Sequence, residues 1–275
     1  MNRYKEIKSL ITLVAIFSLV LPVFGGEEIL VETFDAEGDV EAYTGEGKFF
    51  YSFADSSEEN EHVREVIDGV LRLGYAGSSY GTSMNAMIDF GKTCELLSVA
   101  FDYNALELTS VSSQNGIAFY FGTFPVAAFN PNWHPSWGGA GPLRCWAVVV
   151  VKDGPDCIEA VDDSNAKYQF EIDKETVYRL SFFFNETGET KTFTGPDRLE
   201  YELETEHWSF FVDDELVADN ITKGTSGQYQ YLRGIGMKIS RNYTGAKSLH
   251  EIDNFVVRDD LMMYGHDNTT LLMVW

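Results

Sequence analysis

Hydrophobic and polar side chains alternate along most of the chain after its first 25 residues. The alternation is cleanest in residues 177–185, where Arg179, Ser181 and Asn185 occupy the polar positions. A period of two is typical of an extended strand with one buried face, so this segment predicts a half-buried strand. The same period recurs in residues 97–104, 117–122, 208–212 and 235–239. The apolar positions predicted to face the core of these strands are Leu97, Val99, Phe101, Tyr103, Ile117, Phe119, Phe121, Tyr178, Leu180, Phe182, Phe184, Trp208, Phe210, Val212, Ile235, Met237 and Ile239.

Two other segments complete the secondary-structure prediction. Residues 146–151 form a continuous apolar run, which is typical of a central strand covered on both faces. Residues 56–66 are the one stretch with helical character, and they are polar enough to lie on the surface. Tight turns built from Asp, Gly and Pro separate the strands, as at residues 153–155 and 195–197. Short strands joined by such turns predict an all-β sandwich or barrel.

The first 25 residues have the three parts of a secretory signal peptide. Arg3, Lys5 and Lys8 precede an apolar run over residues 10–23, and the small residues Gly25 and Gly26 follow it. The run is shorter than the roughly 20 residues that a membrane-spanning helix needs. We therefore expect residues 1–25 to be a cleaved signal peptide and residues 26–275 to form one domain. The expected location is secreted or extracellular, with the periplasm and the cell surface as alternatives, and no membrane span is expected after cleavage.

Composition makes the exported part strongly acidic. The 275 residues contain 43 Asp and Glu against 20 Lys and Arg, which gives a formal net charge of −23. The first 25 residues hold three of the basic residues and one acidic residue, so the remainder carries a formal −25. A charge of this sign repels phosphate backbones and anionic lipid surfaces, so nucleic acid is not an expected partner.

Four local patterns follow one another in an order that is typical of one known superfamily. They are residues 30–35 (LVETFD), 66–73 (VIDGVLRL), 208–217 (WSFFVDDELV) and 252–257 (IDNFVV). Together they resemble the concanavalin A-like lectin and glucanase superfamily, which includes the laminin G-like modules. The resemblance implies an antiparallel jelly-roll β-sandwich whose last strand pairs beside the first. The third pattern usually has Gly where Asp214 stands, so its turn is expected to differ in type.

The longest irregular segment, residues 123–144, is the main candidate for ligand binding. Pro and Gly residues prevent a strand or a helix from running through it, and loops of this length are often functional. Trp133 and Trp137 offer flat apolar faces that suit stacking against a sugar ring, while Asn132 and His134 could bond to its hydroxyl groups. The alternative is that both tryptophans fold inward as a cover for the core.

Acidic residues and cysteines supply two further candidates. Asp153, Asp156, Asp162 and Asp163 surround one predicted hairpin and form a candidate calcium site, the alternative being solvated turn residues. Calcium is the one cofactor that this pattern suggests. The chain has three cysteines, so at most one intrachain disulfide forms, and Cys145 with Cys157 is the candidate pair because they flank a single hairpin.

An enzyme of this fold that hydrolyses glycosidic bonds needs two carboxylates on either side of the bond. Glu251 and Asp253 begin the expected strand pattern, but Phe255 and Val256 stand where the second Glu would be. The sequence therefore favours a non-catalytic secreted protein that binds carbohydrate or another extracellular ligand. The alternatives are a polysaccharide-degrading hydrolase or lyase of the same fold and a structural cell-surface component.

Overall fold

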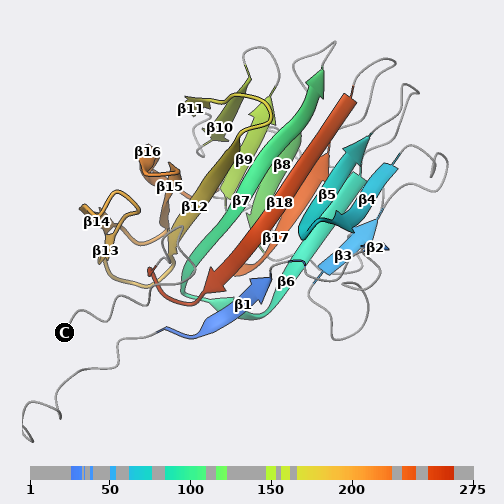
Figure 1. The fold of residues 1–275 in the computed structure, drawn as a ribbon. Coiled ribbons are helices and arrows are strands. Elements are labelled where there is room, and N and C mark those ends of the chain that lie inside the picture. The colour runs from blue at the N-terminus through green and yellow to red at the C-terminus, as the bar shows by residue number, and fades with distance from the viewer. Residues whose placement is uncertain are drawn as a thin grey trace, which may run out of the picture.

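A computed structural model describes residues 26–32, 34, 38–39, 50–53, 62–75, 84–109, 116–122, 147–152, 156–161, 166–224, 231–239 and 247–262. The strands in these residues form two large antiparallel sheets and one separate hairpin (Figure 1). No helix in these ranges is long and apolar enough to cross a bilayer. The predicted all-β antiparallel sandwich is therefore confirmed for the described part of the chain.

The first sheet has nine strands in the described residues and contains both the first and the last of them. Its order is β16 (Glu215–Thr222), β15 (His207–Val212), β12 (Val177–Asn185), β7 (Leu96–Thr109), β18 (Lys247–Arg258), β5 (Val70–Tyr75), β4 (His62–Ile67) and β2 (Gly38–Asp39), with β1 (Glu28–Glu32) also paired to β18. The expected pairing of the closing strand beside the opening strand is confirmed, because Val31 of β1 is the register partner of Val256 in β18.

The second sheet has seven strands in the described residues. Its order is β11 (Lys167–Glu171), β10 (Cys157–Val161), β9 (Ala147–Lys152), β8 (Ile117–Gly122), β17 (Leu232–Ile239), β6 (Met84–Cys94) and β3 (Phe50–Phe53). The predicted strand over residues 146–151 corresponds to β9, which lies between β8 and β10. The separate hairpin consists of β13 (Lys191–Thr194) and β14 (Glu200–Leu203).

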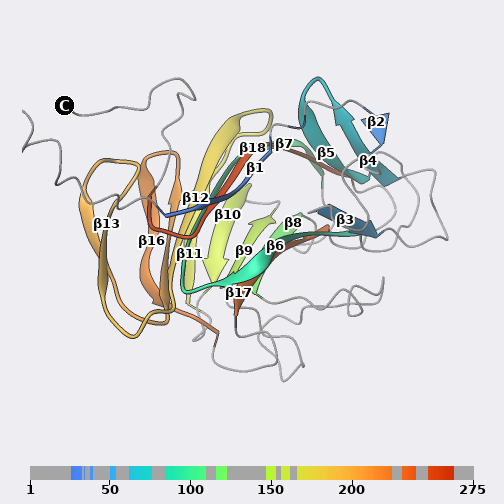
Figure 2. The same cartoon turned by 90° about the horizontal axis from the view of Figure 1, so that it is seen from below.

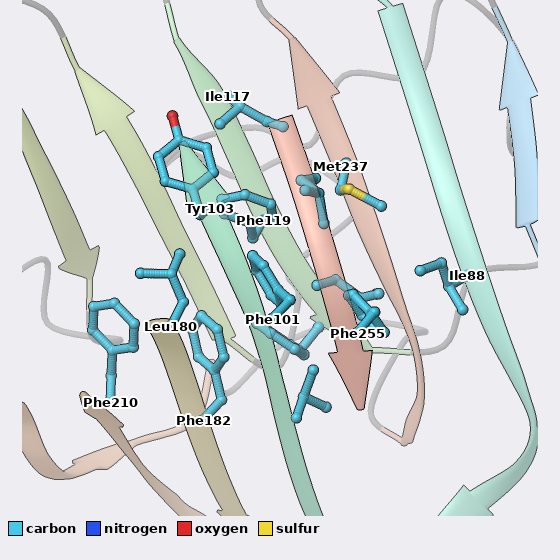
Figure 3. Close-up of a cluster of buried hydrophobic side chains, with 14 of the residues drawn as sticks. Ile88, Phe101, Tyr103, Ile117, Phe119, Leu180, Phe182, Phe210, Met237 and Phe255 are labelled. Carbon is cyan, nitrogen blue, oxygen red and sulfur yellow. The ribbon is translucent and has the colours of Figure 1, made fainter. Parts of the chain in front are cut away.

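The two sheets lie face to face, and the core fills the space between them (Figure 2). Every side chain that alternation assigned to the core is buried there, including Phe101, Phe119 and Phe182, which are fully buried. Figure 3 shows these rings beside Met237 and Phe255 between the sheets. The rings of Phe101 and Phe255 stack with centroids 5.2 Å apart. Burial of so many aromatic side chains supplies the main stabilising term for the sandwich.

The prediction that residues 177–185 are only half buried was wrong. All residues of β12 after Val177 are buried, on both faces of the strand. Phe183 points away from the main core and packs with Phe193 and Phe211 in a second, smaller cluster beneath the β13–β14 hairpin. The outward face of β12 is thus covered by a later part of the chain, which alternation within the strand does not reveal.

A helix over residues 56–66 was also a wrong prediction for the part that the structure describes. His62–Ile67 form β4, which pairs with β5 through a two-residue turn at Asp68 and Gly69. Both turn residues have positive φ, 52° and 79°, as a type I′ hairpin requires. In the β15–β16 turn, Asp213 has a φ of 53° and Asp214 does not have a positive φ, so this turn is not of the type I′ seen at Asp68 and Gly69.

Candidate ligand-binding site

The segment that contains the predicted stacking residues joins two neighbouring strands of the seven-stranded sheet. It follows Gly122 at the end of β8 and leads to Ala147 at the start of β9. Asn132, Trp133, His134 and Trp137 themselves lie outside the described residues, so their roles stay predictions. The structure does describe the edge of the sheet where this segment begins and ends. We call this edge the loop end, defined by Asp89, Gly122, Ala147 and residues 231–234.

The register of three strands sets the backbone of the loop end. Gly234 of β17 is the partner of Gly122 in β8 on one side and of Asp89 in β6 on the other. A register shift in β17 falls between Leu232 and Gly234. A Cβ atom at Gly234 would lie 2.6 Å from the carbonyl oxygen of Ile88, so only glycine allows this close approach.

An ion pair fixes the side chains of β6 and β17 to each other. Arg233 donates from Nε to Asp89 Oδ1 at 3.1 Å and from Nη2 to Asp89 Oδ2 at 3.3 Å. The backbone NH of Gly91 donates to the same Oδ1 at 2.8 Å, which holds the carboxylate in place. The hydrogen bond to Asp89 raises the pKa of Arg233. The two parallel hydrogen bonds fix the planar guanidinium group of Arg233 relative to the carboxylate. The Arg233 side chain is 44% exposed.

An exposed aromatic ring lies two residues before this arginine. Tyr231 is 57% exposed. It is one of four large hydrophobic residues in the described ranges that are exposed to solvent. A ring that stays in contact with water can stack on the apolar face of a sugar, while Asp89 and Arg233 can accept from and donate to its hydroxyl groups. The loop end therefore combines an apolar surface with fixed hydrogen-bonding groups.

Farther from the loop end, the outward face of the same sheet holds buried polar groups. Lys238 alternates with core residues of β17 and is 8% exposed, and burial lowers its pKa to about 8. Glu159 of β10 is fully buried and accepts from Gln169 Nε2 at 2.8 Å. Lys167 lies 3.3 Å from its other carboxylate oxygen. Buried charges of this kind need such partners, so this part of the face is internally satisfied.

Of the four candidate calcium residues, the structure describes Asp156 alone. Asp156 precedes Cys157 and forms an ion pair with Lys174 at 3.3 Å. Asp162 and Asp163 follow Val161 in the sequence and, like Asp153, lie outside the described residues. Within the described ranges, no group of three acidic, His or Cys residues could hold a metal ion. The calcium site stays a prediction.

The cysteine prediction is likewise untested, because Cys145 lies outside the described residues. Cys157 is buried and is the register partner of Lys152, at the end of β9 that is farther from Cys145 in sequence. Cys94 is a buried free thiol, and burial raises its pKa to about 11. A thiol in this state is a poor nucleophile, so Cys94 is a packing residue.

Glu251, considered above as a catalytic carboxylate, lies on the outward face of the nine-stranded sheet. Arg72 donates to it from Nη2 at 2.6 Å, and Asn104 Nδ2 donates to its other oxygen at 3.0 Å. Asp253 accepts from the backbone NH of Asn254. The strand that carries them, β18, lies between β7 and β5. The Glu251 carboxylate therefore links β18 to both neighbouring strands.

Asp89 in β6 and Glu159 in β10 lie on the outward face of the seven-stranded sheet and are separated by four strand spacings, which is about 19 Å. Glycosidase carboxylates are typically about 5–10 Å apart, so these two residues do not form a hydrolytic pair.

Sequence analysis did not identify Asp89, Tyr231 or Arg233 as site residues. Asp89 and Arg233 are 144 positions apart, so only the register of β6 and β17 brings them together. One local signal was present, because glycines at positions 234 and 236 interrupt the side chains of an otherwise typical strand. Such glycines indicate a close approach of backbone.

Comparison with known proteins supports the predicted fold but does not identify a function. No protein-family model matches the sequence, and no curated protein matches it. A protein of unknown function with a galectin-like fold from Bacillus subtilis aligns with 87% of this chain and 99% of its own, with a TM-score of 0.53 and 9% identity. The carbohydrate esterase vb_24B_21 from Shiga toxin-encoding bacteriophage phi24B aligns with 86% of this chain and 100% of its own, with a TM-score of 0.50 and 13% identity.

A sialidase structure also aligns with 90% of this chain, with a TM-score of 0.48 and 11% identity, and the chain spans 20% of the sialidase's length. The galectin-like fold of the Bacillus subtilis protein supports the lectin-like sandwich fold that the four sequence patterns imply. At these identities the likeness concerns the fold alone.

Proposed function

We propose that this chain is an exported, non-catalytic protein that binds carbohydrate at the loop end of the seven-stranded sheet. The observation that carries the proposal is the exposed ring of Tyr231, two residues before Arg233 of the fixed Asp89–Arg233 pair. These groups lie at the edge where the segment with Trp133 and Trp137 is attached. A lectin-like sandwich and a secretory signal sequence are both consistent with an extracellular glycan as ligand.

The chemistry of the loop end matches what a sugar presents. A pyranose ring has an apolar face that packs against an aromatic ring and equatorial hydroxyl groups that both donate and accept. Tyr231 supplies the apolar surface, and Asp89 and Arg233 supply an acceptor and donors that their mutual ion pair holds in place. In this proposal Trp133 and Trp137 add two further stacking surfaces, with His134 and Asn132 bonding to hydroxyl groups.

The test is a glycan array with the exported protein, run once in calcium and once in chelator. The matched variant carries Trp133→Ala and Trp137→Ala, with its folding verified by circular dichroism. We expect wild-type binding to at least one glycan and loss of that binding in the variant. Loss of wild-type binding in chelator would add a calcium requirement involving the Asp153–Asp163 region. A wild-type protein that binds no glycan in either buffer would overturn the proposal and favour a structural role.

A further inference from the structure

A group of charged side chains surrounds the backbone of Gly26, at the start of the first described segment. The Gly26 NH donates to Asp260 Oδ2 at 2.7 Å, and Arg258 Nη2 donates to the Gly26 carbonyl at 3.0 Å. Arg258 also binds Asp260 through two hydrogen bonds of 2.9 Å. The side chains of Arg258 and Asp260 are 8% and 15% exposed. Gly26 is thus held at a mostly buried ion pair just after β18.

The next residue is held by a second ion pair. Lys92 Nζ lies 2.7 Å from both Glu27 Oε2 and Asp259 Oδ2. The Glu27 NH donates to Asp259 Oδ1, and the Asp259 NH donates to the Glu27 carbonyl at 3.1 Å. Residues 26 and 27 therefore contact residues 258–260 through both backbone and side chains, before β1 begins at Glu28.

The charges in this group do not balance. Glu27, Asp259 and Asp260 supply three carboxylates, and Lys92 and Arg258 supply two cations. Burial alone would raise the pKa of Asp260, but hydrogen bonds from Arg258, Met262 and Gly26 lower it overall. Asp260 is therefore ionised at neutral pH. A peptide NH offers it one donor and no charge, whereas an α-ammonium group would offer three donors and the missing positive charge.

The steric fit selects glycine at this position. A Cβ atom on Gly26 would lie 2.3 Å from Cβ of Asp260, so no other residue fits without displacing the aspartate. The sequence before it has the spacing for cleavage at the same bond. A cut after Gly25 places small Gly25 at the cleavage site with Val23 two residues before it, whereas a cut after Gly26 would put bulky Phe24 in that position.

We propose that the mature protein begins at Gly26, and that the α-ammonium group of Gly26 binds the carboxylate of Asp260, while Arg258 holds the Gly26 carbonyl. A host signal peptidase hydrolyses the Gly25–Gly26 bond. The OH of water becomes part of the Gly25 carboxylate, and its hydrogen goes to the Gly26 amine, which takes up a further proton. The mature N-terminus then completes the charge balance beside β18. Removal of the signal peptide therefore stabilises the first strand, independently of any glycan.

The test compares one protein before and after a defined cut. In the full-length precursor, a recognition sequence for a specific protease replaces the residues just before Gly26, so that cleavage leaves Gly26 as the first residue. We expect the folding equilibrium constant from urea unfolding to rise about tenfold on cleavage, the size of a charge-assisted hydrogen bond. An α-ammonium group ordinarily titrates near pH 8, and pairing with Asp260 raises its pKa. The gain should therefore be present below about pH 8 and disappear as the pH rises above that raised pKa.

Two variants and one modification make the result specific. Asp260→Asn should abolish the gain, and Glu27→Gln should keep most of it, because the Glu27 carboxylate is 75% exposed and binds Lys92 rather than the Gly26 nitrogen. Acetylation of Gly26 in the cleaved wild-type protein should remove the gain without restoring the leader. Equal stability before and after cleavage, or a gain that survives acetylation, would overturn the proposal. Sequencing of the naturally exported protein should give Gly26 as its first residue, and any other first residue would contradict it.

Discussion

Two arginine–aspartate pairs lie on the outward faces of the two sheets, and their surroundings differ. Arg179 and Asp102 lie 3.0 Å apart on the nine-stranded sheet, with side chains 9% and 14% exposed. Arg233 and Asp89 lie 3.1 Å apart at the loop end, with side chains 44% and 22% exposed. The first pair is inside a network, whereas the second is open to water.

The network around Arg179 shows why the first pair is structural. Arg179 Nη1 also donates to the Asn254 carbonyl at 2.7 Å, and Asn254 Nδ2 donates to Asp102 Oδ2 at 2.7 Å. Asn254 has a φ of 48° and lies at a bulge, where the register between β18 and β7 shifts. The pair thus secures an irregular point in the sheet. Among the described residues, the Asp89–Arg233 pair has the Gly91 NH as a further partner, and the Arg233 side chain is 44% exposed.

The largest predicted difference between the two pairs is in stability. Arg179→Met should lower the free energy of unfolding by about 3–5 kcal/mol, because it leaves the mostly buried carboxylate of Asp102 without its cation. The matched change Arg233→Met should cost about 0–1 kcal/mol, as is typical of exposed pairs. Urea unfolding of both variants measures the two values. Equal losses would show that the distinction between the two faces is wrong.

A smaller effect on stability is predicted for His250, on the core side of β18, and this effect depends on pH. His250 is fully buried between Tyr103 Oη at 2.8 Å and Ser248 Oγ at 2.6 Å. Burial lowers its pKa to about 3, so the unfolded chain binds a proton at this residue below about pH 6.5 while the folded chain does not. Stability should therefore fall as the pH falls, by about 2 kcal/mol between pH 6.5 and 5.

This pH effect is measured by urea unfolding across pH 5–7.5. His250→Asn should flatten the dependence, whereas the control His207→Gln, at a partly exposed position, should leave it as in the wild type. An unchanged slope in His250→Asn would mean that His250 is not the titrating group.

The contrast between the faces also explains which residues could be predicted from the sequence and which could not. Alternation correctly identified core residues such as Phe182 and Met237, because a strand's own period of two determines which side chains share a face. It failed for Phe183, whose burial depends on the β13–β14 hairpin. It also failed for Asp89 and Arg233, because pairing between strands far apart in the sequence is set by the fold as a whole. Long-range register, rather than local preference, forms the candidate site.

The smallest predicted effect is in ligand affinity, with no change in stability. Tyr231→Ala should weaken binding of a glycan identified on the array by about tenfold, the value of one aromatic stacking contact. Leu199→Ala is the matched control, since Leu199 is 60% exposed but lies in the β13–β14 turn. Titration calorimetry on both variants gives the affinities. Equal weakening by the two changes would remove Tyr231 from the binding site.

Amide hydrogen exchange with and without a bound glycan locates the ligand without relying on a chosen variant. If the glycan binds at the loop end, exchange should slow in residues 86–92 and 231–236 and stay unchanged in β7, β12 and β18 around Arg179. Slower exchange centred on the nine-stranded sheet, with none at the loop end, would contradict this location of the binding site.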